Sequence, residues 1–385
     1  MVNKKLISGV GNKKTKKNNV KNRKHSIIKN KSNKGRRTSK KKNTVIQNGG
    51  FNKEKTVCAP YMVQKGLIGK GLNSNLGTSG KIITADKLEK RIQIQPTVHP
   101  NSCMGHNELI TIINAWNLSY PDEKIVKQNS NGVIKNDNNL WEELRDKIDN
   151  HINQLTDEGE HEWWEQDFVK EKLGLEKLSE IQDKLYAPEA PESWKDNPIT
   201  WLNSLNIEDV LNQYEKMYPE FKSYGAVPID FDLVGSNGGC QVSPLCNIYM
   251  NKLFKGIGNK GLSKKYIGVV FNLDKHYERG SHWVAMFVNI PKAEINYWDS
   301  YGYKPPIEVT KLMNKIKGQL KSLGINAKIQ INNLRHQYKG SECGVYSLHF
   351  IIKQLKGDSY HKVCNNKISD DEMNDYRQMF FTNAK

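Results

Sequence analysis

The stretch "RHQYKGSECGVYSLHF", residues 335–350, places a cysteine directly before an apolar run. From Cys343 onward the apolar residues follow a helical spacing, which predicts a helix over residues 343–355. Cys343 would open that helix, where free backbone N–H groups and the helix dipole favour a thiolate. Three roles are open to this residue: a buried core thiol, a metal ligand or a nucleophile. The rest of the chain has to distinguish them.

The charge of the chain is concentrated at its N-terminus. The 385 residues carry a formal net charge of +18, and 37% of them are hydrophobic. Residues 1–50 contain 17 Lys and Arg and no acid, whereas the remainder has 42 basic and 41 acidic side chains. We therefore predict a disordered basic tail over 1–50, because such a segment cannot bury enough apolar surface to fold. Polyanions are the expected partners of residues 1–47, with any nucleic-acid binding non-specific and through phosphates.

The cysteines and the apolar runs limit the classes of protein that remain. Six cysteines are scattered through the chain and no apolar signal segment opens it, so we expect reduced thiols in a protein that is not secreted. Cys240 and Cys246 have no matching Cys or His pair nearby and are interpreted as core or loop residues. We expect no metal and no cofactor. No run approaches the roughly 18 apolar residues of a membrane span, so no membrane partner is expected.

Residues 51–198 predict a mainly helical arm. Helical spacing of apolar residues begins within 102–117 and returns over 138–155, and residues 160–185 suggest one or two further helices. A proline-rich stretch, "APEAPESWKDNP" at 187–198, then interrupts the pattern and indicates a boundary.

Residues 199–385 mix helical and strand patterns. Their apolar runs are rich in β-branched and aromatic residues and are separated by short gaps, which favours neighbouring strands. The sequence therefore predicts an α+β domain. The expected elements are a turn and helix over 199–221, strands at 266–273, 282–290, 294–300 and 327–334, and helices at 305–324 and 343–355.

Four residues of this half form a set suited to cysteine chemistry. A thiolate needs a base beside it, a group that holds the base, and donors for the oxyanion that forms on a carbonyl. His282 begins one predicted strand and Asp299 ends the next, so antiparallel pairing would bring them together. Gln337 lies six residues before Cys343 and could donate to the oxyanion with the Cys343 N–H.

The order and spacing of this set resemble the Ulp1/adenain clan of cysteine proteases. The matching motifs are "HW" at 282–283, "WDS" at 298–300 and "Q-x5-CG" at 337–344, and "WLNSLNIEDV" from Trp201 is similar to the opening of the SUMO-protease core. With its basic tail and arm, the chain looks most like the thiol proteases of large DNA viruses. The resemblance covers roughly residues 199–355 and implies an adenain/Ulp1-like core.

The resemblance also implies a role for each residue of the set. Cys343 would be the nucleophile, His282 the general base, Asp299 the group that orients the base, and Gln337 part of the oxyanion hole. One departure concerns Ser204, which stands where the SUMO proteases carry aspartate.

The substrates implied are proteins with Gly-Gly sites. Trp283 and Trp201 would flank a narrow channel, which favours glycine because it has no Cβ. The viral branch cuts structural precursors after Gly-Gly during virion maturation, which places the enzyme in the virion or host cytoplasm. The pair before Phe51, "NGGF", is either a self-cleavage site between Gly50 and Phe51 or a plain linker.

Three other functions remain open at this point. A deconjugating protease for a SUMO- or ubiquitin-like modifier would use the same residues on an isopeptide bond. Bacterial effector acetyltransferases share the His–acid–Cys order but need acetyl-coenzyme A, for which the sequence shows no site. A basic nucleic-acid-binding virion protein with a vestigial protease core is the non-enzymatic alternative.

Overall fold

The structure is a computed structural model. It describes residues 50–51, 56–63, 95–128, 131–152, 159–236, 238–255 and 263–382. The predicted basic tail lies outside the described residues, apart from Gly50. None of the described helices is both long enough and apolar enough to cross a membrane.

A five-stranded sheet forms the centre of the C-terminal half, in the order β5-β6-β7-β8-β9. The central strands β6, β7 and β8 are antiparallel to one another, and the two edge strands are parallel to their neighbours. The prediction of neighbouring strands is confirmed, although the first strand falls where the sequence predicted no strand. The strands are β5 (Phe221–Pro228), β6 (Tyr266–Asn272), β7 (Trp283–Asn289), β8 (Glu294–Trp298) and β9 (Lys328–Ile331).

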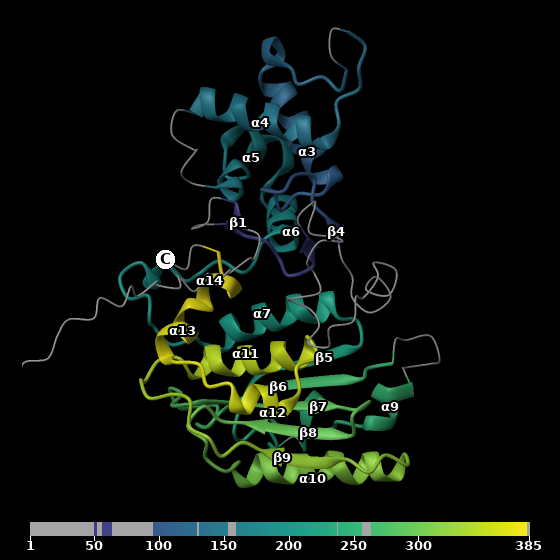
Figure 1. Ribbon diagram of the computed structural model, residues 1–385, viewed down its shortest axis with the longest axis vertical. Coiled ribbons are helices and arrows are strands. Elements are labelled where there is room, and N and C mark those ends of the chain that lie inside the picture. Colours follow the sequence, from purple (N-terminus) through teal and green to yellow (C-terminus); the bar gives the residue numbers. More distant parts are fainter. Residues whose placement is uncertain are drawn as a thin grey trace, which may run out of the picture. The chain divides into compact units, whose positions relative to one another are not determined.

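Helices cover both faces of this sheet (Figure 1). One face packs against α7 (Ser204–Met217) and α11 (Cys343–Leu355), and the other against α10 (Ile307–Ser322). Successive side chains of β7 alternate between the two layers, with Phe287 on the α11 side and Met286 on the α10 side. A strand buried on both faces is apolar without interruption, as β7 is.

Shorter helices complete this half. The α+β prediction is confirmed, and the helices after residue 355 are additions that the sequence did not indicate. These helices are α8 (Ser243–Cys246), α9 (Met250–Lys255), α12 (Tyr360–Asn365), α13 (Asp370–Asp375) and α14 (Arg377–Phe380).

The described part of the arm is mainly helical, with four two-residue strands. Its helices are amphipathic and turn tryptophan and leucine side chains into a common core. The predicted helices correspond to α3 and α4, and those suggested in 160–185 correspond to α5 and α6. The elements are β1 (Gly50–Phe51), β2 (Thr56–Val57), β3 (Met62–Val63), β4 (Gln95–Pro96), α3 (His106–Ser119), η1 (Pro121–Glu123), α4 (Asp137–Ile152), η3 (Glu160–Trp163), α5 (Asp167–Leu173), α6 (Leu175–Leu185) and η4 (Glu192–Trp194).

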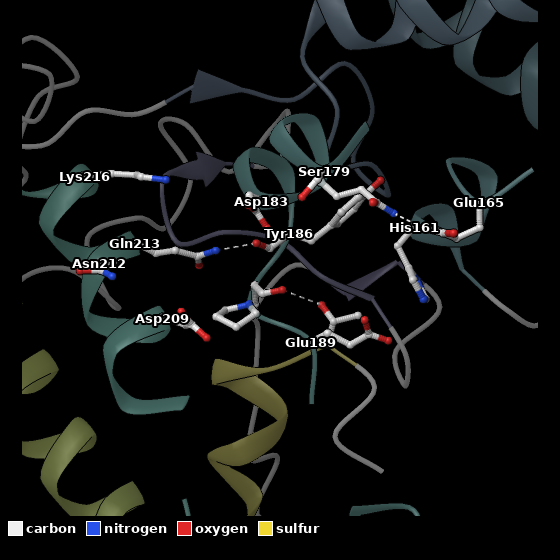
Figure 2. A pocket seen from close by; sticks show the side chains of 14 residues that line it. His161, Glu165, Ser179, Asp183, Tyr186, Glu189, Asp209, Asn212, Gln213 and Lys216 are labelled. Carbon is white, nitrogen blue, oxygen red and sulfur yellow. Dashed lines mark hydrogen bonds between the residues drawn. The ribbon is translucent and has the colours of Figure 1, made fainter. Parts of the chain in front are cut away.

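The apolar core of the arm is continuous with one layer of the sheet domain. A single cluster of buried residues runs from Trp116 in α3 through Leu202 to Ile351 in α11. Hydrogen bonds also cross between the two regions. Gln213 of α7 donates to the main-chain oxygen of Tyr186, which follows α6 (Figure 2). The arm and the sheet domain therefore pack as parts of one compact unit.

The expectation of free thiols is wrong for the arm. Cys58 and Cys103 form a disulfide, with Cα atoms 5.2 Å apart, which is within the range that a disulfide allows. Cys240 and Cys246, in the sheet domain, are also paired as a disulfide. The arm cysteines are 45 positions apart in a stretch with weak periodicity, so only the tertiary fold makes them neighbours.

Candidate active site

The thiol at the centre of the site belongs to Cys343, the first residue of α11. The helix starts here because Cys343 opens the apolar run that packs between the sheet and α7. Cys343 is unpaired and almost fully buried, so its thiol lies among protein groups rather than in bulk water. The first turn of a helix has backbone N–H groups without helical partners, which suits an anionic sulfur.

The antiparallel pairing of β7 with β8 brings His282 and Asp299 together. His282 directly precedes β7 and Asp299 directly follows β8, so the two residues meet at one end of the hairpin. The distance between His282 Nε2 and Asp299 Oδ1 is 2.7 Å. Because Nε2 faces the carboxylate, the remaining ring nitrogen, Nδ1, is the one available to the thiol.

Neighbouring groups fix both members of this pair. The backbone of Asp299 is held by Asn332, whose side chain accepts from the Asp299 N–H at 2.8 Å and donates to its carbonyl at 2.7 Å. The backbone N–H of Tyr301 donates to Asp299 Oδ1 at 2.9 Å. The Tyr301 ring also stacks on the His282 imidazole, with ring centres 4.5 Å apart. The imidazole is therefore held by a carboxylate at its edge and an aromatic ring on its face.

The surroundings of His282 favour its charged form. Burial lowers the pKa of His282, but hydrogen bonds with Asp299 and with the Cys343 side chain outweigh burial and raise the pKa to about 9. The negative charges of the same two groups act in the same direction. An imidazolium beside a thiolate is the resting form that cysteine nucleophiles use.

Gln337 lies on the loop that leads into α11, and its amide is fixed by two hydrogen bonds. Its Oε1 atom accepts from the Ser300 hydroxyl at 2.6 Å, and its Nε2 atom donates to the carbonyl of Lys339 at 2.9 Å. The side chain is completely buried. An amide nitrogen carries two hydrogens, so one remains for an oxyanion near Cys343.

The two tryptophans that the sequence singled out border the start of α11. Trp283 is nearly buried, and its indole N–H donates to the carbonyl of Leu202 at 2.9 Å. Leu202 in turn packs on Gly344, where an added Cβ would lie 3.0 Å from the Leu202 Cβ. Trp201 is 46% exposed. Trp283 thus anchors the segment that carries Trp201, and Leu202 of that segment lies against the residue that follows the nucleophile.

Sequence reasoning missed three residues around this site. Tyr301 follows the "WDS" motif directly, so its position two residues after Asp299 could have indicated contact with the base. Asn332 lies at the end of a predicted strand but carried no motif. Arg377 reaches the turn before Cys343 from α14, and nothing in its local sequence indicates that.

A polar pocket of about 600 Å³ lies elsewhere, where α6, the segment after it and α7 meet (Figure 2). Its lining includes the carboxylates Glu165, Asp183, Glu189 and Asp209 and the ammonium of Lys216. None of the four predicted catalytic residues lines it. Across the part of the chain that the structure describes, no cluster of three His, Cys, Asp or Glu could hold a metal ion.

A cysteine at a helix start, paired with a histidine and an aspartate from a β-hairpin, defines a class of cysteine protease. The sequence agrees with this geometry, since residues 254–385 match the Ulp1 protease family, C-terminal catalytic domain. All four predicted catalytic residues fall within the matched segment.

Two of the proteins that the chain resembles come from viruses. A protein of Acanthamoeba polyphaga mimivirus that bears a thiol-protease name is 38% identical over 184 residues, which are 48% of this chain and 57% of that protein. A "SUMO-1 cysteine protease" of African swine fever virus is 29% identical over 216 residues, 55% of this chain and 77% of that protein. The alignment thus spans little more than half the length of the mimivirus protein.

A solved structure shows the same relationship. The crystal structure of the African swine fever virus protease superimposes with a TM-score of 0.50 and 25% sequence identity. The superposition covers 61% of this chain and 89% of the viral protease. The relationship therefore extends beyond the family segment.

Proposed function

We propose that the chain is a cysteine endopeptidase with Cys343 as nucleophile, His282 as base, Asp299 as the group that orients His282, and Gln337 as an oxyanion donor. The observation that supports this most strongly is the 2.7 Å contact between His282 and Asp299 next to a free, buried thiol at a helix start. The Cys343 side chain also raises the pKa of His282, which links the sulfur to this pair.

The reaction proceeds in two displacements on the scissile carbonyl. The Cys343 thiolate bonds to the carbonyl carbon, and the carbonyl electron pair moves onto the oxygen, which accepts from Gln337 Nε2–H and the Cys343 N–H. The tetrahedral intermediate collapses, the C–N bond breaks, and the leaving amine takes a proton from His282. Water then attacks the thioester while His282 accepts its proton. The C–S bond breaks, which releases a carboxylic acid product and restores the thiolate–imidazolium pair.

A fluorogenic peptide ending in Gly-Gly, offered to the wild type and to Cys343→Ala, tests this proposal. We expect cleavage by the wild type and a loss of about a thousandfold or more in the variant, because the covalent step is removed. A vinyl sulfone probe with the same Gly-Gly sequence should label Cys343. Equal rates in the two proteins, or labelling at Cys364 instead, would contradict the assignment.

We further propose that the substrates are viral structural precursors cut after Gly-Gly, in the virion or in the host cytoplasm. Support comes from the viral relatives, whose names describe proteases. Replacing either glycine of the peptide with alanine should lower kcat/KM at least about tenfold, since a Cβ would meet the channel wall. Equal cleavage of the alanine peptides would argue against a narrow channel.

Deconjugation of a ubiquitin-like modifier is the second candidate. It is favoured by the African swine fever virus relative, whose name describes a SUMO-1 cysteine protease. A side-by-side assay with an isopeptide-linked modifier and an internal Gly-Gly-X peptide separates the two candidates. We expect a higher kcat/KM on the linear peptide, because Ser204 replaces the aspartate that the SUMO proteases carry for partner contact.

The basic tail is assigned a separate role, non-specific binding of nucleic acid. Its 17 basic residues should give an affinity that falls steeply with salt, with a slope of about −0.9 per phosphate neutralised. Deleting residues 1–47 should abolish DNA binding in a salt titration and leave the cleavage of short peptides unchanged. Loss of peptide cleavage in the deletion would refute this separation, and retained DNA binding would favour a vestigial-core virion protein with a binding surface elsewhere.

Self-cleavage between Gly50 and Phe51 is a hypothesis that depends on the proposed protease function. These two residues form β1, which pairs with β2. Intact-mass measurement of the purified wild type after long incubation should show loss of the first 50 residues, and Cys343→Ala should stay whole. An unclipped wild type that cleaves the Gly-Gly peptide would leave "NGGF" as a linker.

A further inference from the structure

Arg377, the first residue of α14, is a cation buried inside the protein. Only 1% of it is exposed. Its Nη2 atom donates to the carbonyl of Ser341 at 3.3 Å, whereas Nε and Nη1 are buried without a hydrogen-bond partner in the described part of the chain. Burying a charge is costly unless it is compensated, so the position of this guanidinium calls for a functional explanation.

The guanidinium lies close to the nucleophile. Ser341, which accepts its hydrogen bond, precedes Cys343 by two residues. Burial lowers the pKa of Arg377 to about 10, and the negative charges of Glu342 and of the Cys343 thiolate oppose that decrease. A cation held this near to a cysteine attracts the negative charge of a thiolate.

The turn between Ser341 and Cys343 is stabilised by hydrogen bonds between its own residues. The backbone N–H and the hydroxyl of Ser341 both donate to the Glu342 carboxylate, at 3.1 and 2.6 Å. Glu342 is itself buried, and its carbonyl accepts the helical hydrogen bond of Tyr346 at 2.9 Å. Arg377 donates to the Ser341 carbonyl, which takes no part in these contacts within the turn. The backbone that presents Cys343 is therefore fixed from two sides.

The opposite face of Arg377 rests on the segment that leads from the arm to the sheet domain. Its Cζ atom lies 4.6 Å from the ring centre of Trp194, which belongs to η4 and is almost completely buried. Phe381, four residues after Arg377, packs edge-on against the same ring at 5.0 Å. A cation over an indole face is attracted by the ring and needs no hydrogen bond on that side. The stack therefore offsets part of the cost of burying the charge, while Nε and Nη1 stay without hydrogen-bond partners.

We propose that Arg377, stacked on Trp194, positions the Ser341–Cys343 turn and stabilises the Cys343 thiolate, so that the end of the arm supports the nucleophile. The inference rests on the proposed protease function, because a thiolate nucleophile is what this support serves. Arg377 acts through the turn and through its field. It is a positioning residue rather than a catalytic one.

The test measures the thiolate directly and needs no substrate. The rate of Cys343 alkylation by iodoacetamide is followed against pH by peptide mass spectrometry in the wild type, Arg377→Met and Arg377→Lys. Arg377→Met should raise the pH midpoint of alkylation by about one unit, because a neighbouring cation shifts a thiol by that order. Its kcat/KM should fall about tenfold or more with KM nearly unchanged. Arg377→Lys should restore the midpoint but recover activity only in part, since an ammonium lacks the planar stack.

Arg145 offers a matched control in the arm. Its guanidinium lies 5.5 Å from the ring centre of Trp141, so Arg145→Met removes a cation over an indole that lies away from the nucleophile. The alkylation profile of this variant should superimpose on that of the wild type. A shift equal to that of Arg377→Met would mean that loss of any such pair loosens the whole fold, and would overturn the specific role.

Trp194→Leu provides a second route if Arg377→Met does not fold. It removes the ring under the guanidinium and should shift the alkylation midpoint in the same direction, by a smaller amount. An unchanged alkylation profile in Trp194→Leu, together with wild-type kcat/KM in both Trp194→Leu and Arg377→Lys, would overturn the proposal. If the wild type cleaves no peptide, the proposed function fails on its own, and the alkylation profiles still decide the role of Arg377.

Discussion

Asp299 in the sheet domain and Glu160 in the arm are both buried carboxylates, but they are surrounded by different kinds of donor. Asp299 faces the imidazole of His282, a group that can carry charge. The donors to Glu160 are neutral: the Trp141 indole at 2.7 Å, the Tyr186 hydroxyl at 3.1 Å, and a backbone N–H at 2.9 Å. The first carboxylate is linked to a thiol through an ionisable partner, and the second is enclosed by groups that do not titrate near neutral pH.

The pKa shifts follow this difference. The hydrogen bonds of His282 overcome burial and keep the imidazole charged, with a pKa of about 9. Burial raises the pKa of Glu160, and the hydrogen bonds it accepts offset that only in part. The surroundings of Asp299 therefore keep His282 protonated and able to donate a proton. The burial of Glu160 stabilises the arm but makes ionisation of this carboxyl less favourable. Mutations at the two carboxylates should separate activity from stability.

The largest effect is expected from Asp299→Asn. The amide can still accept from the Tyr301 N–H but no longer stabilises an imidazolium, so kcat/KM should fall by about 10²- to 10⁴-fold. Thermal melting should be compared above pH 9, where the stability that the raised pKa of His282 contributes has been lost, and there the variant should melt close to the wild type. A variant that keeps wild-type activity, or one that loses its fold before its activity, would remove the contrast with Glu160.

The pH dependence of stability and of kcat/KM gives a second test of the difference between Asp299 and Glu160. The folded-state pKa of His282 is raised from 6.5 to about 9, so the stability it contributes is complete below pH 6.5 and is lost as the pH rises through about 9. The fraction of His282 in the imidazolium form falls over the same pH range. The kcat/KM profile should therefore show an alkaline limb near pH 9. In Asp299→Asn this limb should move to lower pH. A limb at the same pH in both proteins would assign it to another group.

The sequence predicted one of these two carboxylate sites and not the other. Asp299 and His282 stand at the ends of adjacent strands, and Cys343 opens a helix, so local patterns set their places. The donors to Glu160 lie 19, 26 and 57 positions away along the chain, on elements whose packing no local pattern specifies. Arg377 was missed for the same reason, because its partners at Ser341 and Trp194 come together only in the tertiary fold.

Glu160→Gln should affect stability and leave chemistry intact. One amide group would face donors that a carboxylate satisfies, so we expect a loss of about 1–3 kcal/mol in the free energy of unfolding. The kcat/KM of the folded protein should stay within about twofold. The folded-state pKa of Glu160 is raised, so wild-type stability should fall as the pH rises above 4.5, the ordinary value of this carboxyl. This pH-dependent part should be absent from the variant, and parallel melting curves in the two proteins would contradict it.

The smallest effect is expected at Tyr301, which stacks on His282 with ring centres 4.5 Å apart and nearly parallel planes. Tyr301→Ala removes the ring that holds the imidazole on its face, so kcat/KM should fall about tenfold, an orientation effect without loss of the charge pair. Tyr301→Phe keeps the ring and should retain most of the activity. Because the Asp299 hydrogen bond remains in both variants, the alkaline limb should stay near pH 9. A limb that moves in Tyr301→Ala would show that the aromatic ring, and not the carboxylate alone, keeps His282 protonated.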